Sequence, residues 1–249
     1  MTKWLAFDIE TSQGPPTAHE GSYAIGVTCA VTQLEGADPV RWFGDVQPNG
    51  CYALRMSAAA VRALALYLVQ YAASGYRIVG LNSLGFDLRV LAEESQDQYI
   101  FAHLRDVALE HYDPCFQMHC QRGFPVGLNA LAKGFGLEGK TEGMDGETAA
   151  AIWSGSRQDQ EDVLAYCEQD VKTTLDVALN IESAAMMKWI SKKGKRLFEV
   201  TPDGLLTVGE CLALPLPDTD WMKRSGREPW AREKFSGWIE ETQCDKKLF

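Results

Sequence analysis

The chain has 249 residues, 46% of them hydrophobic, and a formal net charge of −10 at pH 7. A chain of this length can bury one sizeable core and a small appended element, as expected for a soluble enzyme. Its longest apolar stretch, residues 58–73, contains Arg62 and Gln70 and is too short to cross a bilayer, so we expect no membrane segment. Seven cysteines without a Cys-x-x-Cys pair, and an N-terminus without a basic-then-apolar signal, predict a cytoplasmic protein.

The predicted elements alternate between strands and helices after an opening of three antiparallel strands. In chain order they are strands over residues 3–8, 24–32 and 40–44, a helix over 57–73, a strand over 76–81, a helix over 86–94, a strand starting at 111–113, and helices over 127–137 and 161–181. Residues 35–39 form the loop between the second and third strands, and Ser57 is the expected N-cap of the first helix. This order predicts an α/β fold in which a mixed sheet is flanked by helices.

Two acidic residues follow the apolar run Trp4-Leu5-Ala6-Phe7. Asp8 and Glu10 are two apart, and such residues point to the same face of a strand, about 6 to 7 Å apart at their bases. Two carboxylates at this spacing can close around hard divalent cations, which prefer oxygen ligands. Because like charges on one face repel, the pair favours a metal ion, a proton on one carboxylate or strong solvation.

Two further segments carry an acidic residue at the end of a predicted element. Asp87 ends the segment Asn-Ser-Leu-Gly-Phe-Asp after a strand, where Asn and Asp also serve as turn residues and helix caps. Tyr166 and Asp170 lie four apart on a predicted helix, so their side chains share one face, with bases about 5 to 6 Å apart. Taken alone, a solvated strand rim, a helix cap or a surface Tyr–Asp pair explains each segment. Their combination, in this order, indicates a two-metal site that cleaves phosphodiesters.

The three motifs together resemble those of the DnaQ-like 3′–5′ exonucleases of the ribonuclease H-like fold, specifically the DEDDy subgroup. In that family the motifs are a strand-borne Phe-Asp-Ile-Glu-Thr-like string, Asn-x-x-x-Phe-Asp, and Tyr-x-x-x-Asp on a helix. The chain carries them as residues 7–11, 82–87 and 166–170. The sister subgroup uses His-x-x-x-x-Asp in the third motif, but Ala165 stands at the histidine position, which excludes a histidine base. The resemblance covers about residues 3–180 and extends to the proofreading-type exonuclease domains of family B DNA polymerases.

The resemblance implies a mixed five-stranded sheet and a 3′–5′ exonuclease that releases nucleoside 5′-monophosphates, with DNA favoured over RNA. It also implies two divalent cations, Mg²⁺ or Mn²⁺, which activate a water molecule and stabilise the departing 3′ oxygen. The implied metal ligands are Asp8, Glu10, Asp87 and Asp170. Tyr166 would orient the attacking water, since a phenol with an ordinary pKa near ~10 is a poor base at neutral pH. Thr11 would touch the terminal nucleotide, and Asn82 would hold the turn that presents Asp87.

The negative charge is distributed unevenly along the chain. Residues 1–184 carry 12 Lys and Arg against 24 Asp and Glu, whereas residues 185–249 carry 12 against 10. We therefore divide the chain into a ribonuclease H-like exonuclease domain over 1–184 and a basic C-terminal extension over 185–249. Its prolines and glycines predict an irregular extension, packed on the core through its tryptophans.

A basic cluster follows the third-motif helix and is interleaved with Trp189 and Phe198. Its members are Lys188, Lys192, Lys193, Lys195 and Arg196. Lys192, Lys193 and Lys195 are the predicted substrate-binding residues, holding single-stranded DNA or RNA that ends in a 3′ hydroxyl. The alternative is a solvated helix end.

Other functions share part of this pattern. A ribonuclease H-like endonuclease or resolvase has the same fold and metals, but the Tyr-x-x-x-Asp motif favours the exonuclease. A phosphatase needs Asp where this chain has Glu10, and a non-catalytic nucleic-acid-binding module is expected to have lost at least one of the four acids. Cys115, His119 and Cys120 lack a fourth partner at zinc-ligand spacing, and Cys167 is expected to be a buried packing residue.

Overall fold

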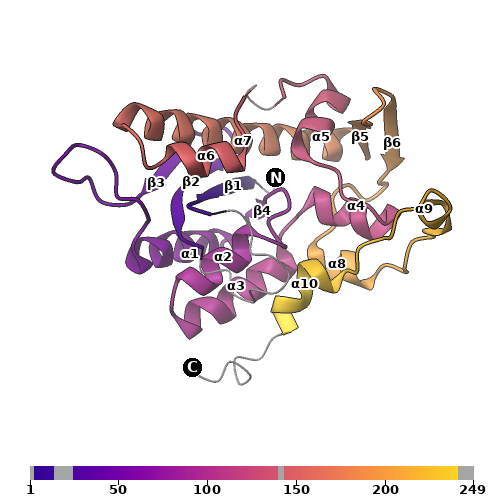
Figure 1. The fold of residues 1–249 in the computed structure, drawn as a ribbon. Helices are drawn as coiled ribbons and strands as arrows, with labels where there is room; N and C mark the ends of the chain where they lie inside the picture. Colours follow the sequence, from indigo (N-terminus) through magenta and orange to yellow (C-terminus); the bar gives the residue numbers. More distant parts are fainter. Residues whose placement is uncertain (1–2, 14–24, 140–142, 241–249) are drawn as a thin grey trace.

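The computed structural model describes residues 3–13, 25–139 and 143–240. Its main sheet has four strands in the order β3-β2-β1-β4. They are β1 (Trp4–Thr11), β2 (Val27–Leu34), β3 (Val40–Phe43) and β4 (Arg77–Val79). The β1–β2 and β2–β3 pairs are antiparallel, as predicted, and β1 and β4 are parallel. The predicted α/β fold, with a mixed sheet flanked by helices, is therefore confirmed (Figure 1).

Helices cover both faces of this sheet (Figure 1). One face carries α1 (Ala58–Ala73), α2 (Asp87–Glu94) and α3 (Gln98–Glu110), and the other carries α5 (Leu128–Phe135), α6 (Gly146–Ile152) and α7 (Arg157–Ala184). The side chain of Ser57 accepts a hydrogen bond from the backbone N–H of Ala60, as expected for the N-cap of α1. α7 begins four residues earlier than predicted, because Ser156 and Asp159 form a capping box there.

β1 is the central strand and is buried on both faces. Its odd-numbered apolar residues pack with α1, α2 and α3, whereas Trp4 and Ala6 pack with apolar residues of α5 and α7. Because side chains alternate along a strand, Asp8 and Glu10 continue the face that looks toward α7. The predicted strand ended at Asp8, but the ladder with β2 continues to Thr11, so both acids lie inside a paired strand.

The main sheet has four strands among the described residues, not the five that were predicted. In the segment 111–113, where the fifth strand was expected, Tyr112 forms only isolated bridges, to β4 and to Thr207. The helix α4 (Pro114–Arg122) begins directly afterwards, and its first residue is a proline, which offers no backbone N–H to a ladder. The chain therefore turns into a helix before a second rung can form.

The C-terminal extension is more regular than predicted. β5 (Met186–Ile190) and β6 (Arg196–Val200) form a separate antiparallel hairpin after α7, and the described residues continue with α8 (Val208–Ala213), α9 (Asp220–Arg224) and α10 (Glu233–Glu240). The prolines and glycines that suggested irregular structure lie between these elements, where they end one and turn the chain into the next. Apolar residues of α8 and α10 belong to the same core cluster as those of β1 and α1. The domain division at residue 184 stays a prediction.

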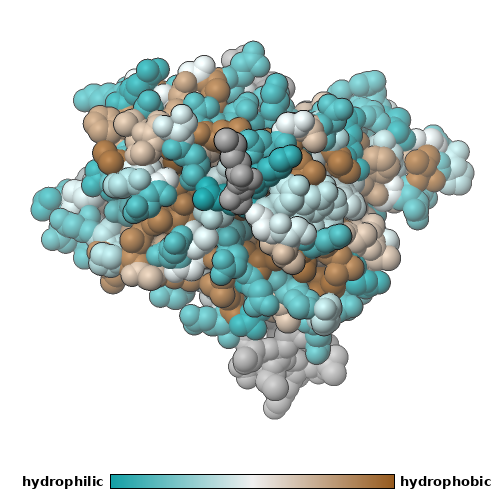
Figure 2. Space-filling view, turned by 180° about the vertical axis from the view of Figure 1, so that it is seen from behind, coloured by the Kyte–Doolittle hydropathy of each residue, from teal (hydrophilic) through white to brown (hydrophobic). Residues whose placement is uncertain are grey.

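Hydrophilic residues cover much of the surface. Figure 2 shows the molecule from behind, and on this face the hydrophobic residues form small groups separated by hydrophilic ones. Within the described part of the chain, no helix combines the length and the apolar character needed to cross a membrane.

Candidate active site

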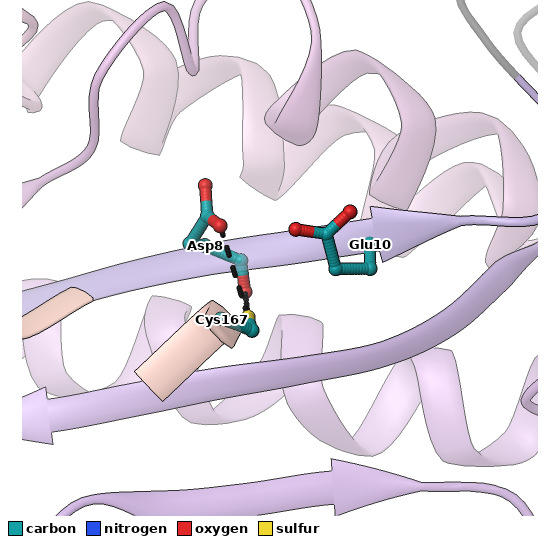
Figure 3. Close-up of side chains that lie close together, drawn as sticks. All are labelled: Asp8, Glu10 and Cys167. Atoms are coloured by element: carbon teal, nitrogen blue, oxygen red, sulfur yellow. Dashed lines mark hydrogen bonds between the residues drawn. The ribbon is translucent and has the colours of Figure 1, made fainter. Parts of the chain in front are cut away.

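Asp8 and Glu10 lie side by side on β1, and the carboxylate of Glu10 points toward that of Asp8 (Figure 3). One ligand atom from each of them and the Sγ of Cys167 all lie within 4.8 Å of one another. Glu10 is buried, with 7% of its surface exposed, while Asp8 is partly exposed. Bonds from hard divalent cations to oxygen are about 2.0 to 2.6 Å long, so the two carboxylates are close enough to share one such ion.

Cys167 on α7 holds Asp8 in place. Its single S–H proton is shared between the backbone carbonyl and the Oδ2 of Asp8, with long sulfur–oxygen distances of 3.5 and 3.7 Å (Figure 3). Burial raises the pKa of the Cys167 thiol well above its usual range, so the sulfur stays protonated and acts as a donor. The sequence predicted only a packing role for Cys167. Its place in the third motif, on the helix face that meets β1, was the available signal for a role in the site.

Asp87 is bonded to the same strand. Its Oδ1 accepts a hydrogen bond from the backbone N–H of Ile9 at 3.1 Å, and Asp87 is only 4% exposed. β4 pairs with β1 only as far as Ala6, so the edge of β1 beyond Ala6 is open to the N-terminus of α2. The acid of the second motif therefore lies against the strand that carries the first motif.

The loop before Asp87 is held by the buried carboxylate of Asp113. This carboxylate accepts hydrogen bonds from the backbone N–H groups of Asn82 at 2.9 Å and Leu84 at 3.1 Å, and from two N–H groups in the first turn of α4. Burial raises the pKa of Asp113 to about 6, against the effect of these four bonds. This role was not predicted from the sequence. The Asp-Pro pair, a common start of a helix, was the available signal.

Asn82 adopts a left-handed backbone conformation, with φ of 62°, and its side chain is exposed. The turn is thus held through the backbone of Asn82. A second support comes from His111, whose Nδ1 lies 2.7 Å from the carbonyl of Ala108 and whose Nε2 lies 3.0 Å from the Ser83 hydroxyl. Burial lowers the pKa of His111 to about 4, so the ring is neutral at pH 7. Its Nδ1–H then donates to the carbonyl, and its Nε2 accepts from Ser83.

Tyr166 and Asp170 lie one turn apart on α7 and are 3% and 4% exposed. α7 packs on β1 through Cys167, which lies between them, and Val171, which follows them; both share a core cluster with Ala6. Tyr166 belongs to a cluster with Cys29, which pairs with Glu10 across the sheet. The structure therefore brings the helix of the third motif to the strand of the first motif.

The predicted substrate-binding residues lie farther apart. Thr11 ends β1, is 6% exposed, and its hydroxyl donates a 2.7 Å bond to the carbonyl of Gln13. The three predicted lysines occupy the exposed turn between β5 and β6. That hairpin lies at the C-terminal end of α7 (Figure 1). About 21 Å of helix separates Asp170 from the C-terminal end of α7, where the hairpin begins.

The donor set fits hard divalent cations. Asp8 and Glu10 offer converging carboxylate oxygens, and the one sulfur nearby is a thiol that already donates to Asp8. Within residues 3–13, 25–139 and 143–240, no other group of three or more Cys, His, Asp or Glu side chains reaches this proximity. Cys115, His119 and Cys120, which were considered as zinc ligands, form no such group.

A mixed sheet whose central strand carries two carboxylates, with a long helix packed against them, defines a ribonuclease H-like domain with an acidic site suited to divalent cations. The sequence model of the RNase_H superfamily matches residues 5–181. The chain belongs to this superfamily. Membership supports a nuclease-like function with a nucleic-acid substrate and divalent metal ions.

Among solved structures, the chain is similar to the family B DNA polymerase from the hyperthermophilic archaeon Pyrobaculum calidifontis. The TM-score is 0.52 at 16% sequence identity, over 73% of this chain and 24% of the polymerase. The chain thus spans about a quarter of that protein's length, and the likeness concerns the fold. A search of curated proteins found no match.

Proposed function

We propose that this protein is a 3′–5′ exonuclease of the DEDDy subgroup, which hydrolyses the last phosphodiester at a 3′ end and releases nucleoside 5′-monophosphates. The proposal depends chiefly on one observation, the proximity of the paired carboxylates of Asp8 and Glu10 to the α7 segment that includes Tyr166 and Asp170. Asp87, bonded to the same strand, supplies the fourth acid. The tyrosine at this position favours an exonuclease over an endonuclease or resolvase.

Each residue of the site has a proposed task. The four acids bind two divalent cations, Mg²⁺ or Mn²⁺, which when bound supply an activated water and neutralise charge on the leaving 3′ oxygen. Tyr166 orients the attacking water through its hydroxyl. Thr11 contacts the terminal nucleotide, and Asn82 keeps the turn that presents Asp87. Cys167 and Asp113 act on the acids indirectly, by holding Asp8 and the loop before Asp87.

Single-stranded nucleic acid is the proposed substrate, with DNA favoured over RNA, and the β5–β6 hairpin is the proposed surface that holds it. Residues 186–200 contain five Lys and Arg and one Glu, in a chain with a net charge of −10. Lys188 pairs with Phe198 and Ile190 with Arg196 across the hairpin, so cations and an aromatic ring share one face. Phe198 is 64% exposed there. Cations that track phosphates beside a ring on which a base can stack are typical of single-strand binding.

Replacing Lys192, Lys193 and Lys195 together by Ala is expected to weaken substrate binding and leave turnover at saturation nearly unchanged. Each lost phosphate contact on a single strand should flatten the salt dependence of binding by about 0.7 in log–log slope. The measurement is a salt titration of oligonucleotide affinity, with KM and kcat determined separately. The matched control removes three other exposed cations, Lys223, Arg224 and Arg227, and should keep the wild-type slope. Wild-type affinity and slope in the hairpin variant would make the cluster a solvated turn.

The experiment that tests the proposed activity is digestion of end-labelled oligonucleotides, single- and double-stranded, DNA and RNA, with Mg²⁺ or Mn²⁺. A 5′-labelled single strand of DNA should shorten stepwise, a 3′-labelled strand should release labelled mononucleotide at once, and a circular strand should resist. Cutting of the circle would instead identify an endonuclease or resolvase. Tight binding without cleavage would identify a non-catalytic binding module.

The proposal includes the division into an exonuclease domain over residues 1–184 and an extension over 185–249 that packs on it. Apolar side chains of α8 and α10 in the main core cluster support this packing. The proposal also includes a cytoplasmic location. It depends only on the seven cysteines, an odd number without a Cys-x-x-Cys pair, which suggest reduced thiols.

A further inference from the structure

The loop between β4 and α2, residues 80–86, has a third support, besides Asp113 and His111, in the helix α10. The indole N–H of Trp238 donates a hydrogen bond to the backbone carbonyl of Leu84, with a nitrogen–oxygen distance of 2.8 Å. Trp238 is 2% exposed. Its ring packs edge-on against that of Phe101 on α3, with the ring centroids 6.0 Å apart, and α10 lies beside α3 (Figure 1). A hydrogen bond buried in this way is shielded from competing water, so it fixes the position of Leu84 strongly.

Phe235, one turn earlier on α10, packs against the same loop. A Cβ placed on Gly85 would lie 3.0 Å from the Cδ1 of Phe235, so the ring fills the space that a side chain at Gly85 would need. On its other side Phe235 contacts Phe116 and His119 of α4, at ring distances of 5.7 and 4.9 Å. α10 is thus wedged between α4 and this loop.

Leu84 is consequently held through both of its backbone polar groups. Its N–H donates to the carboxylate of Asp113, and its carbonyl accepts from Trp238. Three residues later, Asp87 opens α2 and its carboxylate meets the backbone of Ile9. The residue before Asp87 is Phe86, whose side chain has no group that can cap a helix, so the start of α2 depends on support from outside the helix.

We propose that α10 supports the metal-binding site from outside it and that Trp238 is a positioning residue for Asp87. This inference relies on the proposed function only in treating Asp87 as a ligand of a divalent cation. The C-terminal extension then has two roles, one in its hairpin and one in α10. Loss of the Trp238 hydrogen bond lets the backbone of Leu84 move. Because Asp87 follows only three residues later, the position of its carboxylate then becomes less fixed.

The decisive variant is Trp238→Phe, which removes the N–H and keeps most of the ring. Mn²⁺ affinity, measured by calorimetry or by electron paramagnetic resonance, should fall by about 10- to 100-fold, as for other residues that hold a metal ligand in place. Amide hydrogen exchange of residues 83–88 should become faster without metal. In an Asp87→Asn background, Trp238→Phe should weaken Mn²⁺ binding no further, because the ligand that it positions is already lost.

The matched control is Trp42→Phe. The indole N–H of Trp42 also donates a hydrogen bond, to the Thr32 hydroxyl at 3.0 Å. Trp42, however, lies on the edge strand β3. This variant should lose one hydrogen bond and keep wild-type Mn²⁺ affinity. Phe235→Leu is a second test, which keeps the indole bond and loosens the packing on Gly85, and it should weaken Mn²⁺ binding in the same direction.

Wild-type Mn²⁺ affinity in Trp238→Phe overturns the inference, as does an equal loss in Trp42→Phe. If Trp238→Phe does not fold, Phe235→Leu decides alone by the same criterion. Failure of the proposed function looks different. The wild-type protein would then bind no Mn²⁺ or cleave nothing, whereas faster exchange of residues 83–88 in Trp238→Phe would still show that α10 positions the loop.

Discussion

Replacing any one of the four acids by its amide, as in Asp8→Asn, Glu10→Gln, Asp87→Asn or Asp170→Asn, is expected to lower turnover by more than about 100-fold. Loss of a residue that merely supports a metal ligand costs about 10- to 100-fold, so loss of the ligand itself should cost more. The amides keep the size of the side chain and remove its charge, which isolates the contribution of the carboxylate. Initial rates on a 5′-labelled single strand, with saturating Mg²⁺ or Mn²⁺, measure the effect.

A suitable control for these variants is Asp162→Asn, which removes an exposed carboxylate from the same helix that carries Asp170. It should retain wild-type rates. Without metal, each of the four site variants should be at least as thermally stable as the wild type, because removing one charge relieves repulsion among the remaining carboxylates. Wild-type turnover in Asp8→Asn, or full activity in excess chelator, would contradict the two-metal proposal.

The local signals in the sequence predicted much of the framework around the site. The continuous apolar run Trp4-Leu5-Ala6-Phe7 marked β1, and Ser57 marked the start of α1, because both signals depend only on residues within a few positions of each other. The first motif ends β1 and the second leads into α2, but the third lies within α7 and not at an element end as predicted; fold topology brings the three elements together. Such features need no knowledge of distant contacts.

The supports of the site could not be predicted in the same way, because they are long-range. Cys167 reaches Asp8 across 159 residues of sequence, and Trp238 reaches Leu84 across 154. A cysteine in a helix and a tryptophan near the end of a chain have many possible partners, and only the folded backbone selects one. The sequence therefore indicated the acids and left unidentified the groups that hold them.

The C-terminal extension illustrates a different difficulty. Its frequent prolines and glycines were interpreted as irregular structure, but they separate short regular elements that are stable only against the rest of the protein. The basic cluster was likewise interpreted without its hairpin, since the alternation in Met186–Ile190 is short and its partner strand is largely exposed. An isolated two-stranded hairpin is only marginally stable in water, so the stability of this one depends on its packing against α5. Gly134 of α5 lies so close to the backbone of Lys188 that a side chain there would clash.

Tyr166→Phe is expected to lower turnover by about 10²- to 10⁴-fold, the usual cost of losing a group that handles a proton in the transition state. The ring stays in its buried cluster with Cys29 and Trp153, so the fold and the position of Asp170 should be preserved. Substrate affinity should change little, because a hydroxyl that orients water contributes to the reaction rather than to holding the strand.

Tyr52→Phe provides a matched control for Tyr166→Phe. Tyr52 belongs to the same cluster, but its hydroxyl donates to Glu161 at 3.0 Å and accepts from Arg157, away from the paired carboxylates. Single-turnover rates should therefore be slow only in Tyr166→Phe, whereas the oligonucleotide affinities of both variants should stay close to that of the wild type. The opposite pattern in Tyr166→Phe, unchanged turnover with greatly weakened affinity, would make Tyr166 a residue that stacks on the substrate. Its hydroxyl would then have no part in orienting the attacking water.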